Sequence, residues 1–136
     1  MSFEEDLKAA REAPIEYEDV PIELNGHLYT FRFLQLSGPE WAAESDLHPA
    51  RPGVLLDTKV TGYNLRTLCM AVAKKTGRRI EGNPDDADVT LVELSPEEWD
   101  DLYRAIPGNA KVRIDDAIWS LNEARPQARV DALKKG

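Results

Sequence analysis

Apolar and polar residues alternate on both sides of Asn25-Gly26, which is the pattern of a β-hairpin. Asn-Gly is the preferred two-residue hairpin turn because both central positions need a positive φ. The pattern predicts a hairpin over about residues 20–36. Pro21 has no backbone N–H to donate, so its strand is expected at a sheet edge.

One face of this hairpin is expected to be apolar and to face the core. A two-residue turn pairs Ile22 with Tyr29 and Val20 with Phe31, and places all four side chains on the same face. Cross-strand pairs of aromatic and β-branched residues each contribute on the order of 0.2–1 kcal/mol. Tyr29 and Phe31 are also candidate contacts for a protein partner, because aromatic residues are enriched at binding hot spots.

Helical spacing of apolar residues dominates the rest of the chain. Two of the helix starts share one capping pattern, in which Ser37 or Ser95 caps the helix and a glutamate follows three residues later. The clearest stripes contain Leu65, Leu68, Cys69 and Val72 in one helix, and Trp99, Leu102, Tyr103 and Ile106 in another. The expected helices cover about residues 2–12, 37–48, 62–76, 95–106 and 109–123.

The segments between these helices carry weaker signals. Residues 48–61 are expected to form a loop, residues 79–81 a short extended segment, and residues 89–94 either a short strand or an apolar loop. Residues 124–136, beyond the last helix, are expected to form a flexible basic tail. The fold class is therefore α+β and mainly helical, with the hairpin packed on roughly four or five short helices in a single domain over residues 1–136.

The last predicted helix is apolar on two sides. Ile114, Ile118 and Leu121 form one stripe, and Val112 and Trp119 form a second stripe that is rotated by about 90–150° at roughly 100° per residue. Two explanations stay open: the helix is central in the core, or its second stripe binds a partner. Val112 and Trp119 are therefore candidate partner-binding residues.

The net charge of −8 and the sequence pI of about 4.8 narrow the possible partners. An acidic surface repels phosphate backbones and anionic lipids, so neither nucleic acid nor a membrane is an expected partner. No apolar run approaches the roughly 20 residues that span a bilayer, and the first residues lack the pattern of a secretory signal. The expected location is intracellular.

The sequence offers little for catalysis or metal binding. The two histidines, His27 and His48, lie outside zinc-ligand spacing. The single cysteine, Cys69, lies in an apolar helical stripe and is expected to be buried and unreactive. Residues 83–94 lack the glycine and glutamate of a calcium loop. We therefore expect no enzyme, no cofactor and no metal, although stabilisation by an added cofactor would revive the enzyme class.

The N-terminal third resembles the tail assembly chaperones of long-tailed bacteriophages, especially those that infect actinobacteria. The resemblance rests on two stretches: residues 20–33, an apolar strand followed by Asn-Gly and Tyr-x-Phe-Arg, and residues 36–41, Leu-Ser-Gly-Pro-Glu-Trp. The chain length and the acidic helical remainder also fit this family.

The resemblance implies a role in tail assembly. Such chaperones bind the tape measure protein, a long helical chain that aggregates when naked, and they act in the host cytoplasm and are absent from the finished virion. A longer form, made by programmed frameshifting, recruits tail-tube subunits. Lys134-Lys135-Gly136 fits slippery codons, but it fits a solubilising basic end equally well.

Two other classes of protein remain as alternatives. One is a structural head-to-tail connector or tail-completion protein of the virion. The other is a small acidic bacterial adaptor or immunity-type protein that blocks a basic partner. A tape measure gene directly downstream would separate the three. The sequence determines neither the oligomeric state nor the partner's binding segment.

Overall fold

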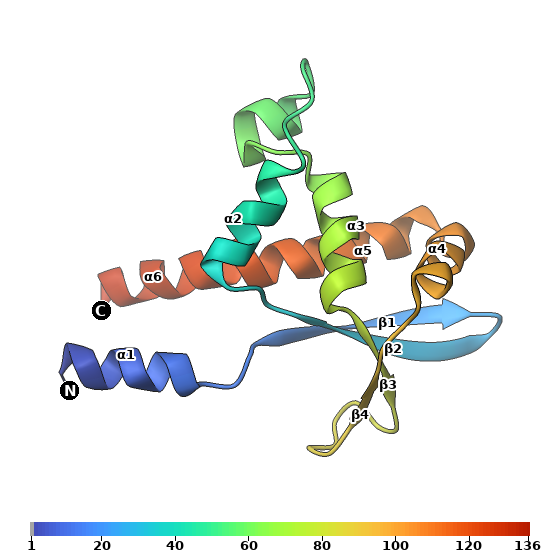
Figure 1. The fold of residues 1–136 in the computed structure, drawn as a ribbon, viewed down its shortest axis with the longest axis horizontal. Helices are drawn as coiled ribbons and strands as arrows, with labels where there is room; N and C mark the ends of the chain where they lie inside the picture. Colours follow the sequence, from blue (N-terminus) through green and yellow to red (C-terminus); the bar gives the residue numbers. More distant parts are fainter. Residues whose placement is uncertain (1) are drawn as a thin grey trace.

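The hairpin is the centre of the fold in the computed structural model, which describes residues 2–136 (Figure 1). Its strands are β1 (Tyr17–Leu24) and β2 (His27–Leu34), and the turn residues Asn25 and Gly26 have φ values of 51° and 81°. The pairs Val20–Phe31 and Ile22–Tyr29 have the predicted register. The predicted hairpin is therefore confirmed, but β1 begins earlier, at Tyr17, and β2 ends at Leu34, before the expected end.

The hairpin is extended into a four-stranded antiparallel sheet of order β1-β2-β3-β4. The added strands are β3 (Arg78–Glu81) and β4 (Thr90–Val92). The sequence indicated an extended segment at β3 and left β4 open, because such short strands carry too few residues for a period-2 pattern. β1 is an edge strand, as Pro21 predicted.

The helices confirm the α+β, mainly helical fold class. α3 and α5 pack on each other, α5 also packs on the hairpin, and α2 packs on α3. One continuous cluster of buried side chains joins the sheet to these helices. Within residues 2–136 the helical segments are α1 (Phe3–Glu12), α2 (Gly38–Asp46), η1 (Leu56–Thr61), α3 (Leu65–Thr76), α4 (Pro96–Ala105), α5 (Gly108–Trp119), η2 (Ser120–Ala124) and α6 (Arg125–Lys135).

The segment expected to be a loop before α3 contains the π-helical turn η1. Asp57 is fully buried there, and its carboxylate accepts hydrogen bonds from the backbone N–H and the guanidinium of Arg51 at 2.8–3.1 Å. These bonds lower the pKa of Asp57. Gly62 ends the turn with a φ of 83°. The sequence missed η1 because an ion pair, and not apolar periodicity, holds it together.

The C-terminal segment, for which the sequence predicted a flexible basic tail over residues 124–136, is helical up to Lys135. The chain stays helical from Gly108 to Lys135, and η2 widens the helix just before Pro126. In a π-turn the Leu121 carbonyl would accept from residue 126, and proline has no N–H to donate. The Gln35 side-chain amide donates to that carbonyl instead, at 2.6 Å. A distant residue therefore satisfies the carbonyl that Pro126 leaves free.

Candidate functional site

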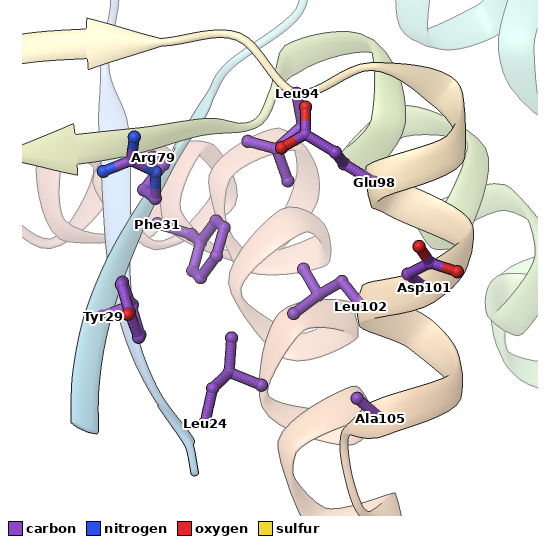
Figure 2. A pocket seen from close by; sticks show the side chains of 9 residues that line it. All are labelled: Leu24, Tyr29, Phe31, Arg79, Leu94, Glu98, Asp101, Leu102 and Ala105. Carbon is purple, nitrogen blue, oxygen red and sulfur yellow. The ribbon is translucent and has the colours of Figure 1, made fainter. Parts of the chain in front are cut away.

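The hairpin and α4 enclose an apolar groove of about 290 Å³ (Figure 2). α4 lies over the right-hand end of the hairpin in Figure 1. Phe31 and Leu102 face each other across the groove, and Tyr29 and Leu24 lie toward the hairpin turn. The full lining consists of Leu24, Tyr29, Phe31, Arg79, Leu94, Glu98, Asp101, Leu102 and Ala105.

Short-range contacts fix the two walls of the groove. At the hairpin, the Glu23 carboxylate accepts the Gly26 backbone N–H at 2.8 Å. At α4, Ser95 and Glu98 form the predicted capping box, with hydrogen bonds of 2.9 and 3.1 Å. The turn of the hairpin and the start of α4 are therefore fixed by local hydrogen bonds, and the groove is preformed.

Trp99 connects α4 to the hairpin through aromatic contacts. Its side chain is buried, and its ring lies 6.2 Å from the Phe31 ring and 6.4 Å from the Phe33 ring. The Tyr103 ring, on the next turn of α4, lies 6.2 Å from it on another side. Aromatic pairs at these separations contribute about 0.5–1.5 kcal/mol each beyond their buried area. The Phe31 ring, which lines the groove, therefore rests on an aromatic base of Trp99, Phe33 and Tyr103.

The rim of the groove is charged. Glu98 and Asp101 extend from α4, and Arg79 extends from β3 (Figure 2). The Arg79 guanidinium pairs with Glu81 at 3.2 Å, which reduces its positive charge. Among residues 2–136 no cation pairs with Asp101. The rim on the α4 side is therefore acidic, and it suits an apolar group flanked by positive charge.

The four sequence-predicted contact residues fall in different places. Tyr29 is partly exposed in the wall of the groove. Phe31 is only 2% exposed, so it belongs to the core and contributes the edge of its ring to the groove floor. Val112 is 38% exposed on α5, and Trp119 is half-buried against the core. Neither Val112 nor Trp119 lines this groove.

Sequence reasoning missed the contribution of α4 to this site. Leu102 was assigned to a core-facing stripe, and Leu94 to a short apolar segment. The helical stripe that contains Leu102 does face the core, but its outer edge also forms one wall of the groove. The hairpin and α4 are about 70 residues apart in the chain, and no local pattern in the sequence indicates that they meet. The acidic residues at the start of α4 were the signal in the sequence that could have indicated its part in the site.

Elsewhere the structure places polar groups in the core. The buried Asp115 carboxylate accepts from Lys111 at 2.7 Å and from Arg66 at 3.0 Å. Burial raises the pKa of Asp115 despite these partners. Burial also raises the pKa of the nearby Cys69 thiol to about 12, which keeps it protonated and a poor nucleophile. His48 contacts Thr67 at 2.9 Å.

Within residues 2–136, no three side chains of His, Cys, Asp or Glu lie together as metal ligands would. None of the helices in that range combines the length and the apolar character needed to cross a bilayer.

The fold and the groove define the class as an α+β domain with a preformed apolar groove. Comparison with known proteins adds no relative to this class: no family model matches the chain, and no curated protein or solved structure is significantly similar to it.

Proposed function

We propose that this chain is a tail assembly chaperone that binds the tape measure protein in the host cytoplasm and keeps it soluble until the tail is built. The proposal is supported by the resemblance of residues 20–33 and 36–41 to the opening of such chaperones. The observation that carries it is the apolar groove with an acidic rim between the hairpin and α4.

The chemistry of the groove fits one class of partner. A volume of about 290 Å³ can hold one or two bulky apolar side chains, and the walls are formed before binding. Glu98 and Asp101 would pair with lysine or arginine next to those side chains. An amphipathic helix that carries apolar anchors beside basic residues satisfies both conditions. A tape measure protein exposes many such helical turns.

The net charge of −8 supports the second half of the role. A complex that covers an aggregation-prone helix stays soluble when its remaining surface carries a net charge that repels other copies of the complex. A longer form made by frameshifting near Lys134-Lys135-Gly136 would recruit tail-tube subunits while α1–α5 keep the groove, and the chaperone would leave before the virion is complete.

The test is co-expression with tape measure fragments that tile the partner's length. The fragments should be insoluble alone, and some should become soluble and co-purify with this chain. Ala105→Arg, which fills the groove from an exposed position, and Tyr29→Ala should each lower the recovery of the complex by roughly tenfold or more. Asp101→Lys should weaken binding most at low salt.

Leu28→Ala is the matched control for Tyr29→Ala. Leu28 is the next residue on the same strand, it points to the opposite face and it is 73% exposed. Its loss should leave binding unchanged. Tape measure fragments that stay insoluble in the presence of the chain would refute the proposed function. Fragments that bind equally well to all the groove variants would refute the groove as the site.

A further inference from the structure

α1 and α6 form a pair of arms with unpartnered apolar stripes. Both helices extend from the same end of the molecule, where the two chain ends lie (Figure 1). Neither helix contains a buried residue. On α1, Phe3 and Leu7 are 74% and 53% exposed, and on α6, Val130 and Leu133 are 47% and 81% exposed. A folded chain rarely leaves two such stripes in water without a partner for them.

The two stripes match each other in spacing. On α1 the small or apolar positions are Phe3, Leu7 and Ala10, and on α6 they are Pro126, Val130 and Leu133. Both follow the i, i+4, i+7 pattern of a helix face about 100° wide. If the helices are laid antiparallel, Phe3 meets Leu133, Leu7 meets Val130 and Ala10 meets Pro126.

The charges of the two arms are opposite at the ends that this arrangement brings together. The first turn of α1 carries Glu4, Glu5 and Asp6, and the last turn of α6 carries Lys134 and Lys135. None of these five side chains forms an ion pair with another of residues 2–136. The antiparallel pairing therefore joins apolar to apolar and acidic to basic in one register.

The stripes stay exposed within one chain, so the pairing is not made there. α6 is held to the root of β1 by ion pairs from Arg125 to Glu18 and from Arg129 to Glu16. α1 is separated from β1 by Pro14, which restricts the linker. An open hollow of about 680 Å³ lies between the end of α1 and the body, and Ala10, Ile15 and Leu36 are among its lining residues. This hollow keeps the end of α1 apart from the body of its own chain.

From these observations we infer that α1 of one copy docks on α6 of a second copy, and reciprocally, in a two-fold symmetric dimer. The interface is isologous, so each chain supplies one acidic arm and one basic arm. The arms of two chains would then cover all four apolar stripes at once. This inference does not depend on the proposed function, since it concerns the opposite end of the molecule from the groove (Figure 1).

The test measures the mass of the full chain by light scattering during size-exclusion chromatography and by sedimentation equilibrium. At tens of micromolar the mass should be twice the 15.3 kDa of one chain. Leu7→Asp and Leu133→Asp, both at exposed positions, should each raise the dissociation constant by roughly tenfold or more. Leu28→Asp, also exposed but on the hairpin, is the control and should leave the dimer intact.

A charge-swap experiment identifies the pairing. Chains with Glu4→Lys and Glu5→Lys, or with Lys134→Glu and Lys135→Glu, should be monomeric alone because each homodimer would bring like charges together. A mixture of the two variants should form heterodimers, because every contact then joins opposite charges. A wild-type chain that is monomeric at 100 µM, or variants that dimerise alone as well as in mixture, would overturn the inference. Closure of α1 onto α6 within one chain would give the first of these results.

Discussion

Gly77 lies where α3 meets the aromatic base of the groove, and its replacement by alanine tests how tightly that junction is packed. A Cβ atom at Gly77 would lie 2.6 Å from Trp99 Cη2, 2.6 Å from the Ala73 carbonyl oxygen and 2.8 Å from Phe33 Cε1. Its φ of −72° and ψ of 143° are open to any residue, so the substitution adds no backbone strain. The effect of Gly77→Ala is therefore steric.

Two opposing terms decide the sign of the change in unfolding free energy. A Gly→Ala change at a compatible φ stabilises by about 0.4–1 kcal/mol, because the unfolded chain has less freedom to lose. Overpacking a dense core costs about 1–3 kcal/mol. The clash involves a backbone oxygen and two buried rings, so neither side moves easily. We expect Gly77→Ala to lower the free energy of unfolding by about 1–2 kcal/mol.

Urea unfolding monitored by tryptophan fluorescence and by circular dichroism measures this change. Gly38→Ala is the matched control: a Cβ there would have nothing within 4 Å, and the position is helical, so the variant should be as stable as the wild type or slightly more stable. Trp99→Phe removes the Cη2 atom, so Gly77→Ala should cost less in that background. A Gly77→Ala chain that is as stable as the Gly38→Ala chain would refute the packing argument.

Four further outcomes follow from the structure. Gly26→Val should destabilise the fold by about 1 kcal/mol or more in urea unfolding, because a β-branched residue resists the φ of 81°. Cys69 should resist a thiol reagent at pH 8 and react only on unfolding, since burial raises its pKa to about 12. Trp119→Ala should lower the free energy of unfolding by about 1–3 kcal/mol. This is less than expected for a fully buried tryptophan, because the Trp119 side chain is only half-buried. The ion pair with Arg51 lowers the pKa of Asp57 in the folded state. The stability that Asp57 contributes is therefore present above its unfolded pKa and is lost as the pH falls through its folded pKa. Asp57→Asn should make the loss of stability below about pH 4 smaller than in the wild type.

The features that the sequence predicted are those set by neighbouring residues. The hairpin register follows from Asn25-Gly26, and the starts of α2 and α4 follow from capping boxes four residues long. The features that it missed depend on distant partners. The helical C-terminus needs Gln35 to bond the Leu121 carbonyl across 86 positions. β4 exists because β3 offers it a paired edge. No local pattern encodes these contacts.

The candidate site divides in the same way. Tyr29 could be singled out from the hairpin alone, because alternation fixes which face it lies on. Phe31 shares that face, and its burial depends on tertiary packing, including that of Trp99 against it. The α4 wall of the groove required knowledge of how a later helix lies across the hairpin. Residue faces were therefore predictable, whereas the meeting of two faces was not.

The positions of the groove and the arms decide how the two proposed interactions would combine. The groove lies at the hairpin-turn end of the sheet, and α1 and α6 extend from the other end (Figure 1). A dimer joined through the arms therefore keeps both grooves open and far apart. Two grooves on one particle would bind a long partner with repeated helical turns more tightly than one groove, because the second contact is intramolecular. Leu133→Asp should then weaken the capture of a fragment with two binding segments and leave the capture of a one-segment fragment unchanged. Equal loss for both fragments would show that α6 contacts the partner directly.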